Sequence, residues 1–218
     1  MSIKAIDLYC CAGGASLGLW EAGFEVTGVD IEYQKNYPFR FIQVDVMALT
    51  VEFLQEFDFI WASPPCQRYT LAGTQWRNIG KEYPDLIEKT RELLQRTGKP
   101  YVIENVPGAP LINPVMLCGT MFGLRTYRHR MFETNFPVQQ LIHPKHVAKN
   151  AKMGRPPKDN EFLQIVGHFS GVPLARDILG LPKLNQYELA QSIPPVYSKY
   201  LAEEYLGVEK EKAEGGRP

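Results

Sequence analysis

The first 30 residues limit the possible folds of this chain more than any other stretch. IKAIDLY, residues 3–9, predicts a buried strand, and the turn CCAGGAS leads into a short helix over SLGLWEAG. FEVTGVD, residues 24–30, predicts a second strand that ends on Asp30. Strand, turn, helix and strand make a βαβ unit, whose helix N-terminus and uncovered backbone suit a nucleotide-like cofactor.

The alternation of strands and helices continues along the chain. Strands are predicted over residues 39–46, 57–63 and 99–106, and helices over residues 83–98 and over PVYSKYLAEEYLG near the C-terminus. Such alternation is typical of an α/β fold with a mostly parallel central sheet.

The composition is that of an ordinary globular domain. The 218 residues, 44% hydrophobic and 22% charged, can bury a core without disulfides or metal ions. MSIKAIDLYC is too polar for a signal peptide, and no apolar run approaches the ~18 residues of a membrane span. We therefore expect a cytoplasmic protein. The four cysteines lack zinc-ligand spacing and a disulfide pattern, so we predict reduced thiols and no metal site.

Charge is balanced overall but unevenly placed. The 24 basic and 24 acidic residues cancel, so net charge is no evidence for a nucleic-acid partner. From Arg125 to Lys158, however, the only acidic residue among many basic ones is Glu133. This stretch could face phosphates, or it could be a solvated basic loop, and both interpretations stay open.

Three candidate functional groups lie at the ends of predicted strands. They are the glycine turn at residues 10–14, Cys66 in the stiff sequence SPPCQ, and Glu104 in VIENV. Because ligands of open α/β sheets collect at the carboxyl ends of the strands, these groups are expected to converge on one pocket.

Several motifs occur in an order that points to one family. DLYCCAGGASLG, SPPCQRYTLAG, VIENVPG and TYRHRMF resemble, in sequence order, the motifs of the S-adenosylmethionine-dependent DNA cytosine-5 methyltransferases. ELAQSIPPVYSKYLAEEYL is similar to the C-terminal motif of that family. The resemblance implies a Rossmann-like methyltransferase fold, with helices on both faces of the sheet. The family carries a target-recognition region before the C-terminal motif. In this chain that region, residues 136–185, is short and resembles that of compact bacteriophage members.

The resemblance also implies a catalytic set. Cytosine C5 cannot attack a methyl sulfonium unaided, so a nucleophile must first add at C6, and a thiolate is the strongest that a protein offers. Cys66 is the candidate nucleophile. Glu104 would hold N3 and the 4-amino group, Arg128 would donate to O2, and Arg130 would support the loop or the backbone. Packing of a buried Cys66 thiol and ordinary ion pairing of Glu104 or Arg130 are the alternatives.

A cofactor site for S-adenosylmethionine follows from the same resemblance. Asp30 would bind the ribose hydroxyls, although it could instead cap a helix, and Asp45 would accept from the adenine amino group. Ile31 would cover the adenine and Tyr9 would contact it, unless both only pack in the core. The full predicted set is Tyr9, Cys10, Cys11, Ala12, Gly13, Gly14, Asp30, Ile31, Asp45 and Pro64.

The predicted partner is double-stranded DNA with the target cytosine flipped out, because C6 cannot be attacked within a base stack. Arg68, Trp76 and Arg77, in the loop after Cys66, suit a strand backbone and a vacated stack. Arg155 in GRPPK resembles a minor-groove hook, although a proline-rich linker is the alternative. The short recognition region predicts low sequence specificity.

We predict four segments and a monomer. Residues 1–135 form the catalytic and cofactor-binding core, 136–185 a small irregular recognition insert, 186–207 a C-terminal helix that returns to the core, and 208–218 a flexible tail. Two other functions stay open: an RNA cytosine-5 methyltransferase of the transfer-RNA type, and a catalytically idle DNA-binding module.

Overall fold

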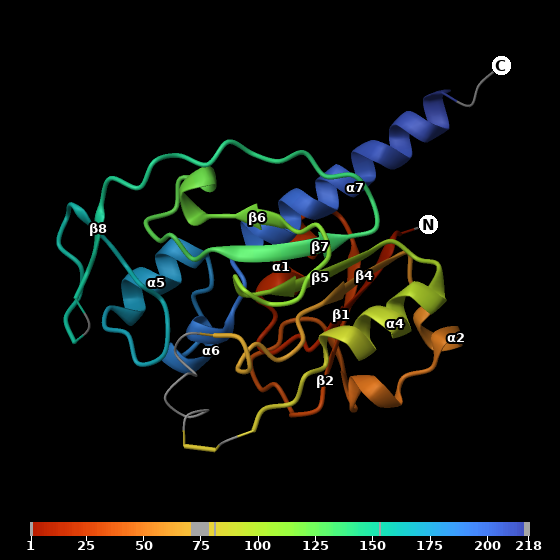
Figure 1. Cartoon of the computed structure of the whole chain (residues 1–218), viewed down its shortest axis with the longest axis horizontal. Coiled ribbons are helices and arrows are strands. Elements are labelled where there is room, and N and C mark those ends of the chain that lie inside the picture. The colour runs from red at the N-terminus through yellow and green to blue at the C-terminus, as the bar shows by residue number, and fades with distance from the viewer. Residues whose placement is uncertain (1, 71–78, 81, 153, 216–218) are drawn as a thin grey trace.

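A seven-stranded sheet, in the order β3-β2-β1-β4-β5-β7-β6, forms the centre of the computed structural model (Figure 1). The structure describes residues 2–70, 79–80, 82–152 and 154–215. The strands are β1 (Lys4–Leu8), β2 (Glu25–Asp30), β3 (Arg40–Gln43), β4 (Phe59–Ala62), β5 (Tyr101–Asn105), β6 (Val115–Leu117) and β7 (Arg130–Thr134). Strands β1 to β5 pair in parallel, whereas β7 is antiparallel to both β5 and β6. The predicted α/β fold with a mostly parallel sheet is confirmed.

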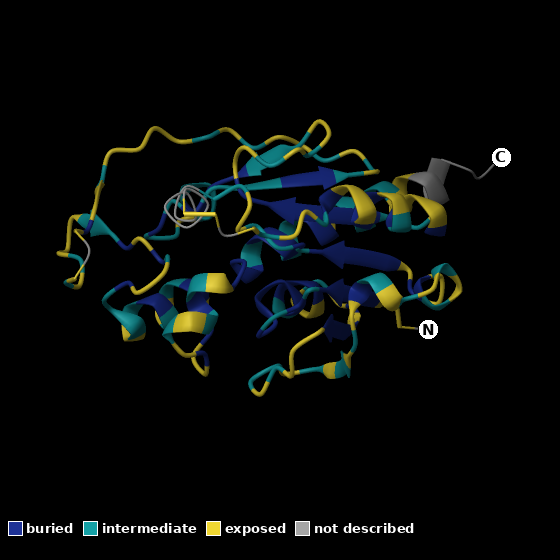
Figure 2. Cartoon of the chain, turned by 60° about the horizontal axis from the view of Figure 1, so that its bottom comes forward, coloured by how far each residue is buried: buried dark blue, intermediate teal, exposed yellow. Residues whose placement is uncertain are grey.

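Helices cover both faces of the sheet. The helices α1 (Gly14–Glu21) and α7 (Pro195–Gly215) share a buried cluster with Ala5 of β1 and Trp61 of β4. The opposite face is covered by α2 (Val51–Leu54) and α4 (Ile87–Thr97), where Leu54 and Leu94 pack with Ile6. The central strands are therefore buried on both sides, as Figure 2 shows, which explains why β4 is a continuous apolar run.

The contact between α1 and α7 is unusually close. A Cβ atom on Gly18 would lie 1.9 Å from the carbonyl oxygen of Pro195, so only glycine fits there. The Ser198 hydroxyl donates to the Ala15 carbonyl at 2.8 Å. The C-terminal helix thus locks onto the first βα unit.

Helix α7 runs eight residues past the end that the sequence predicted, from Gly207 to Gly215, and extends beyond the sheet in Figure 1. The predicted tail from residue 208 is helical up to Gly215. The residues after Gly207, VEKEKAE, are mostly strong helix formers, which accounts for the continuation.

The region between β7 and α7 carries more regular structure than the sequence indicated. It contains the short parallel pair β8 (Lys149–Asn150) and β9 (Glu161–Phe162), and the helices α5 (Val172–Leu179) and α6 (Gln186–Gln191). Its buried residues Leu163, Phe169 and Leu189 pack together with Ala12 of the first βα turn. The insert is therefore anchored to the core beside the cofactor-binding turn that the sequence predicted.

Two 3-10 helices, η1 (Val46–Ala48) and η3 (Gly119–Phe122), complete the elements used below. None of the helices in the described ranges is both long and apolar enough to cross a membrane.

Candidate active site

Cys66 lies in a loop that is held at both ends. Ser63, directly after β4, donates its backbone N–H to Leu8 at 3.1 Å, and the Asn105 side chain donates to the Pro64 carbonyl at 2.9 Å. The Cys66 carbonyl in turn accepts from the backbone N–H of Thr70 at 3.0 Å. The two prolines have no backbone N–H to donate, so the hydrogen bond from Asn105 to the Pro64 carbonyl fixes the loop that presents the Cys66 thiol.

Glu104 and Arg130 form an ion pair beside this thiol. Arg130 Nε lies 3.0 Å from Glu104 Oε1, and the two side chains are 14% and 7% exposed. Burial raises the pKa of Glu104, and the Arg130 guanidinium opposes that shift. Burial also raises the pKa of the Cys66 thiol, as does the charge of Glu104, whereas Arg130 and then Arg128 lower it. The three groups are thus electrostatically coupled.

The structure places Arg128 differently from the sequence prediction. Alternation in YRHRMF predicted that Arg128 and Arg130 share one face of a strand, but β7 begins only at Arg130, and Arg128 has a φ of 33°. That prediction is wrong. The buried Arg128 guanidinium donates to the backbone carbonyls of Ala190, Ser192 and Ile165. Arg130, rather than Arg128, therefore contacts Glu104.

A cavity of about 280 Å³ joins the Cys66 loop to the first βα turn. Its wall includes Glu104 and Arg130, and also Asp7, Asp30 and Ile31, of which the Ile31 side chain is 63% exposed. Asp30 accepts from the backbone N–H of Cys11 and of Glu32, both at 3.0 Å, so it shapes the turn. The hydrophobic side chain of Ile31 and the carboxylate of Asp30 therefore lie side by side at the end of β2.

Asp7 is a cavity residue that the sequence analysis did not single out. It is fully buried in β1, and its Oδ2 accepts from the Ser16 hydroxyl at 2.5 Å. Its Oδ1 has no hydrogen-bond partner within the described part of the chain. Burial above all, opposed by the Ser16 hydrogen bond, raises the pKa of Asp7 to about 7. The signal that could have revealed it is an acid within an otherwise apolar buried strand.

The other predicted cofactor residues divide into two groups. The cavity is lined by Tyr9, Cys10, Cys11, Gly14 and Pro64 as well as by Asp30 and Ile31. Ala12 packs instead in the insert cluster, and Gly13 caps α1 with a φ of 86°. Asp45 is exposed, accepts from the Met47 N–H at 2.9 Å at the start of η1, and does not line the cavity. Tyr187, Gln191, Ser192 and Ile193 also line it and were not predicted.

A second cavity, of about 380 Å³, adjoins the first at Arg130. It lies between the sheet end and the insert, with Val106 and residues 126–130 on one side and Asn150 and residues 163–166 on the other. Arg130 lines both cavities, so the ion pair with Glu104 stands at their junction.

Two of the residues predicted to contact DNA, Arg68 and Arg155, lie in ion pairs within the chain. The Arg68 guanidinium lies 3.5 Å from the Asp85 carboxylate, with about half of its side chain exposed. Arg155 forms a bidentate ion pair with Glu161, and both N–O distances are 2.7 Å. Trp76 and Arg77 lie outside the described residues.

Comparison with known proteins supports one family. Residues 3–111 match the model of the C-5 cytosine-specific DNA methylases. The type II methyltransferase M1.HphI of Haemophilus parahaemolyticus is 32% identical over 126 residues, which cover 49% of this chain and 33% of that protein. M.FnuDI of Fusobacterium nucleatum is 32% identical over 114 residues, with the same coverage. The chain therefore spans about a third of the length of these curated relatives.

Solved structures share the fold over nearly the whole chain. A prophage-encoded Escherichia coli protein assigned as a DNA modification methyltransferase has a TM-score of 0.69 at 15% identity, covering 96% of this chain and 100% of its own. The S. pombe methyltransferase Dnmt2 has a TM-score of 0.62 at 13% identity, covering 95% and 99%. At such low identity the likeness concerns the fold alone.

Proposed function

The chain belongs to the C-5 cytosine-specific DNA methylases, and from this premise we propose that it methylates C5 of cytosine in DNA, with S-adenosylmethionine as methyl donor. The observation that carries the proposal is the placement of Cys66, Glu104 and Arg130 around one cavity at the carboxyl ends of β4 and β5. A nucleophile, an acid and a cation are the three groups that this chemistry requires.

Cys66 would add through its sulfur to C6 of the target cytosine. The addition breaks the C5–C6 double bond and makes C5 nucleophilic enough to take a methyl group. Loss of the C5 proton and of the sulfur then restores the aromatic ring. The fixed loop around Pro64 supports this role, because a nucleophile held in place avoids the entropic cost of orienting it.

Glu104 and Arg130 would hold the base while charge builds up in its ring. A protonated Glu104 can donate to N3, and its burial, which raises its pKa, favours the proton there. Arg130 can then donate to O2, the role that the sequence resemblance gave to Arg128. Arg128, whose guanidinium is taken up by backbone carbonyls, would instead support the turn before β7.

The residues of the cavity fit S-adenosylmethionine. The Asp7 Oδ1, which lacks a partner within the described ranges, suits the ammonium group of the methionine part, and Asp30 suits the ribose hydroxyls. Ile31 can cover the adenine from its exposed position. When bound there, the cofactor supplies an electrophilic methyl group. Asp45, which does not line the cavity, is left out of this site.

The target cytosine would be flipped from the duplex into the second cavity and reach Cys66 past Arg130. The insert between β7 and α7 lines that cavity through Asn150 and residues 163–166, which makes it the region that meets the neighbouring bases. Because this insert is short, we propose a recognition sequence of only a few base pairs.

DNA containing 5-fluorocytosine tests the proposal, because fluorine at C5 cannot leave as a proton. With S-adenosylmethionine, the wild-type protein should form an adduct with this DNA that survives denaturation, and Cys66→Ser should form none. The same duplex with ordinary cytosine is the control and should be methylated without a lasting adduct. Methylation by the wild type without any adduct would overturn the assignment of Cys66.

A second measurement addresses the polymer and its sequence. Methyl incorporation from labelled S-adenosylmethionine should be higher with duplex DNA than with transfer RNA or free deoxycytidine nucleotides. A higher rate on RNA would contradict DNA as substrate, and methylation confined to a site of six or more base pairs would contradict the proposed low specificity.

A further inference from the structure

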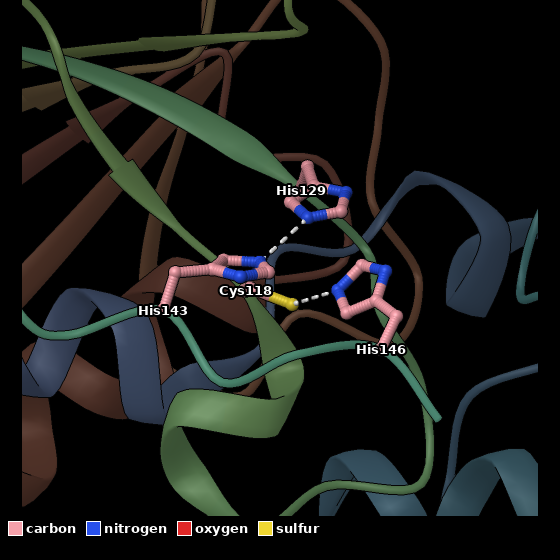
Figure 3. A group of neighbouring side chains, drawn as sticks. All are labelled: Cys118, His129, His143 and His146. Carbon is pink, nitrogen blue, oxygen red and sulfur yellow. Dashed lines mark hydrogen bonds between the residues drawn. The ribbon is translucent and has the colours of Figure 1, made fainter. Parts of the chain in front are cut away.

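Four side chains from separate segments converge at the β6–β7 edge of the sheet. Cys118 follows β6, His129 precedes β7, and His143 and His146 lie on the segment that links β7 to β8. One potential ligand atom from each residue lies within 4.8 Å of all the others. Figure 3 shows the sulfur and the ring nitrogens pointing toward one another. This group, the Cys–His cluster, includes three of the four histidines of the chain.

We propose that the Cys–His cluster binds a zinc ion. Tetrahedral zinc, with bonds of about 2.3 Å to sulfur and 2.0–2.1 Å to nitrogen, separates its ligand atoms by roughly 3.3–3.6 Å. The Cys118 Sγ to His146 Nε2 distance is 3.4 Å, and the His129 Nε2 to His143 Nε2 distance is 3.1 Å. These two distances are close to the coordinated values, and since the four ligand atoms all lie within 4.8 Å of one another, binding would draw the side chains together onto one ion.

The chemistry of the donor atoms favours zinc over a hard cation. One thiolate and three imidazoles suit zinc, whereas magnesium and calcium prefer oxygen ligands. Cys118 is fully buried, and its sulfur lies 3.0 Å from the Thr120 hydroxyl, which can donate to a thiolate. One sulfur and three imidazole nitrogens facing a common point are a donor set that zinc can use.

The arrangement of the imidazole rings also supports a bound cation. The Nε2 atoms of His129 and His143 point at each other, so without a metal one of them must carry the proton that joins the two. The ring centroids of His129, His143 and His146 lie 4.7–5.3 Å apart, so the three rings surround one point. A shared cation satisfies all three lone pairs at once.

Such a site would be structural, because four protein ligands leave no open coordination position. It would fasten the β7–β8 segment to the sheet, where Gln140 already bonds the backbone of Met116 in β6. Tyr127 stacks on His146 at a centroid distance of 3.6 Å and donates to the Ala148 carbonyl at 2.6 Å. His129 directly precedes Arg130, so the metal would also fix the start of β7.

This site was not predictable from the sequence, because the four ligands do not form a short motif. Cys118 lies 25 residues before His143, and His129 lies 14 residues before it. Only the antiparallel pairing of β6 with β7, and the return of the next segment along that edge, bring them together. The prediction of no metal site is therefore replaced by this proposal.

The test begins with the metal content of the full-length protein, purified without chelators and with any affinity tag removed. Elemental analysis should find one zinc ion per chain. If the protein is purified without zinc, it should retain one zinc ion per chain after incubation with zinc chloride and gel filtration. His143→Ala/His146→Ala should lower the zinc affinity at least about a hundredfold in a competition titration. His168→Ala, which changes the exposed histidine outside the cluster, should bind zinc like the wild type.

Cobalt supplies a readout of the ligands themselves. Co²⁺-loaded wild type should show the strong visible bands of tetrahedral coordination and a thiolate-to-metal band, and Cys118→Ser should lose the thiolate band. Zinc should raise the melting temperature of the wild type and of His168→Ala but not of the double variant. A wild type that holds no more zinc than the double variant, or lacks the thiolate band, overturns the proposal. Neither readout depends on methylation.

Discussion

The guanidinium of Arg130 lies 3.0 Å from the carboxylate of Glu104, where β7 runs antiparallel to β5. Both side chains line the cavity that also contains Cys66. A group that raises the pKa of the Cys66 thiol and a group that lowers it are thereby held in contact. The reactivity of the thiol in the free enzyme consequently depends on the balance between two charges.

Replacing Glu104 should therefore separate thiol reactivity from catalysis. In Glu104→Gln the negative charge near Cys66 is gone, so the pKa of the thiol falls and iodoacetamide alkylates Cys66 at lower pH than in the wild type. Methylation should nevertheless fall about 10²–10³-fold, because the group that stabilises charge on the ring is lost. Alkylation of the free enzyme and single-turnover methylation measure the two effects.

The other cysteines provide the background for this measurement. Cys66→Ser reports alkylation at the remaining sites, and burial raises the pKa of both Cys10 and Cys11, so these thiols should react slowly. An alkylation profile of Glu104→Gln that coincides with the wild-type profile, or moves to higher pH, would show that Glu104 does not act on the thiol.

Two glycine substitutions should have opposite effects on stability. Gly18→Ala places a methyl group 1.9 Å from the Pro195 carbonyl between α1 and α7, and we expect the free energy of unfolding to fall by at least about 2 kcal/mol. Gly207→Ala, in an exposed part of α7 with open space around it, should raise it by about 1 kcal/mol. Urea titrations give both values, and equal effects would contradict the close helix contact.

The core of the fold was predictable because its residues carry local signals. Continuous apolar runs such as FIWA in β4 indicate strands buried on both faces, and that is where β4 lies. Cys66 lies in the loop after β4 and Glu104 near the carboxyl end of β5, so the shared edge of a parallel sheet brings them together. Local pattern and topology suffice for this half of the site.

Arg128 was not predictable in the same way. The spacing in YRHRMF fits a strand from Arg128 onward, but the side chain is fixed by carbonyls of Ile165 and Ser192, which are 37 and 64 residues away. These distant acceptors hold Arg128 at a left-handed φ that only tertiary contacts make favourable. The choice between the two arginines thus depends on contacts that no local pattern records.

Asp7 should make the stability of the protein depend on pH. Its folded pKa of about 7 lies above the value of 3.8 of a free side chain, so the folded state binds more protons between these pH values. Stability from this group is present at pH 4 and is lost as the pH rises through 7. Asp7→Asn removes the dependence, so its urea midpoint relative to wild type should be higher at pH 8 than at pH 5. An unchanged difference would contradict a protonated Asp7.

The buried pair between Arg91 and Glu133 should matter more for stability than the pair on the insert. Arg91, on α4, bonds both carboxylate oxygens of Glu133 in β7 at 2.8 Å, and Glu133 also accepts from the Ile112 N–H. Glu133→Ala leaves the buried guanidinium with only the exposed Glu88 carboxylate and the Pro110 carbonyl as partners, so we expect a loss of about 3 kcal/mol in urea unfolding. Glu161→Ala, which breaks the more exposed pair with Arg155, should cost clearly less. Equal losses would mean that burial of the Arg91 pair does not set its contribution.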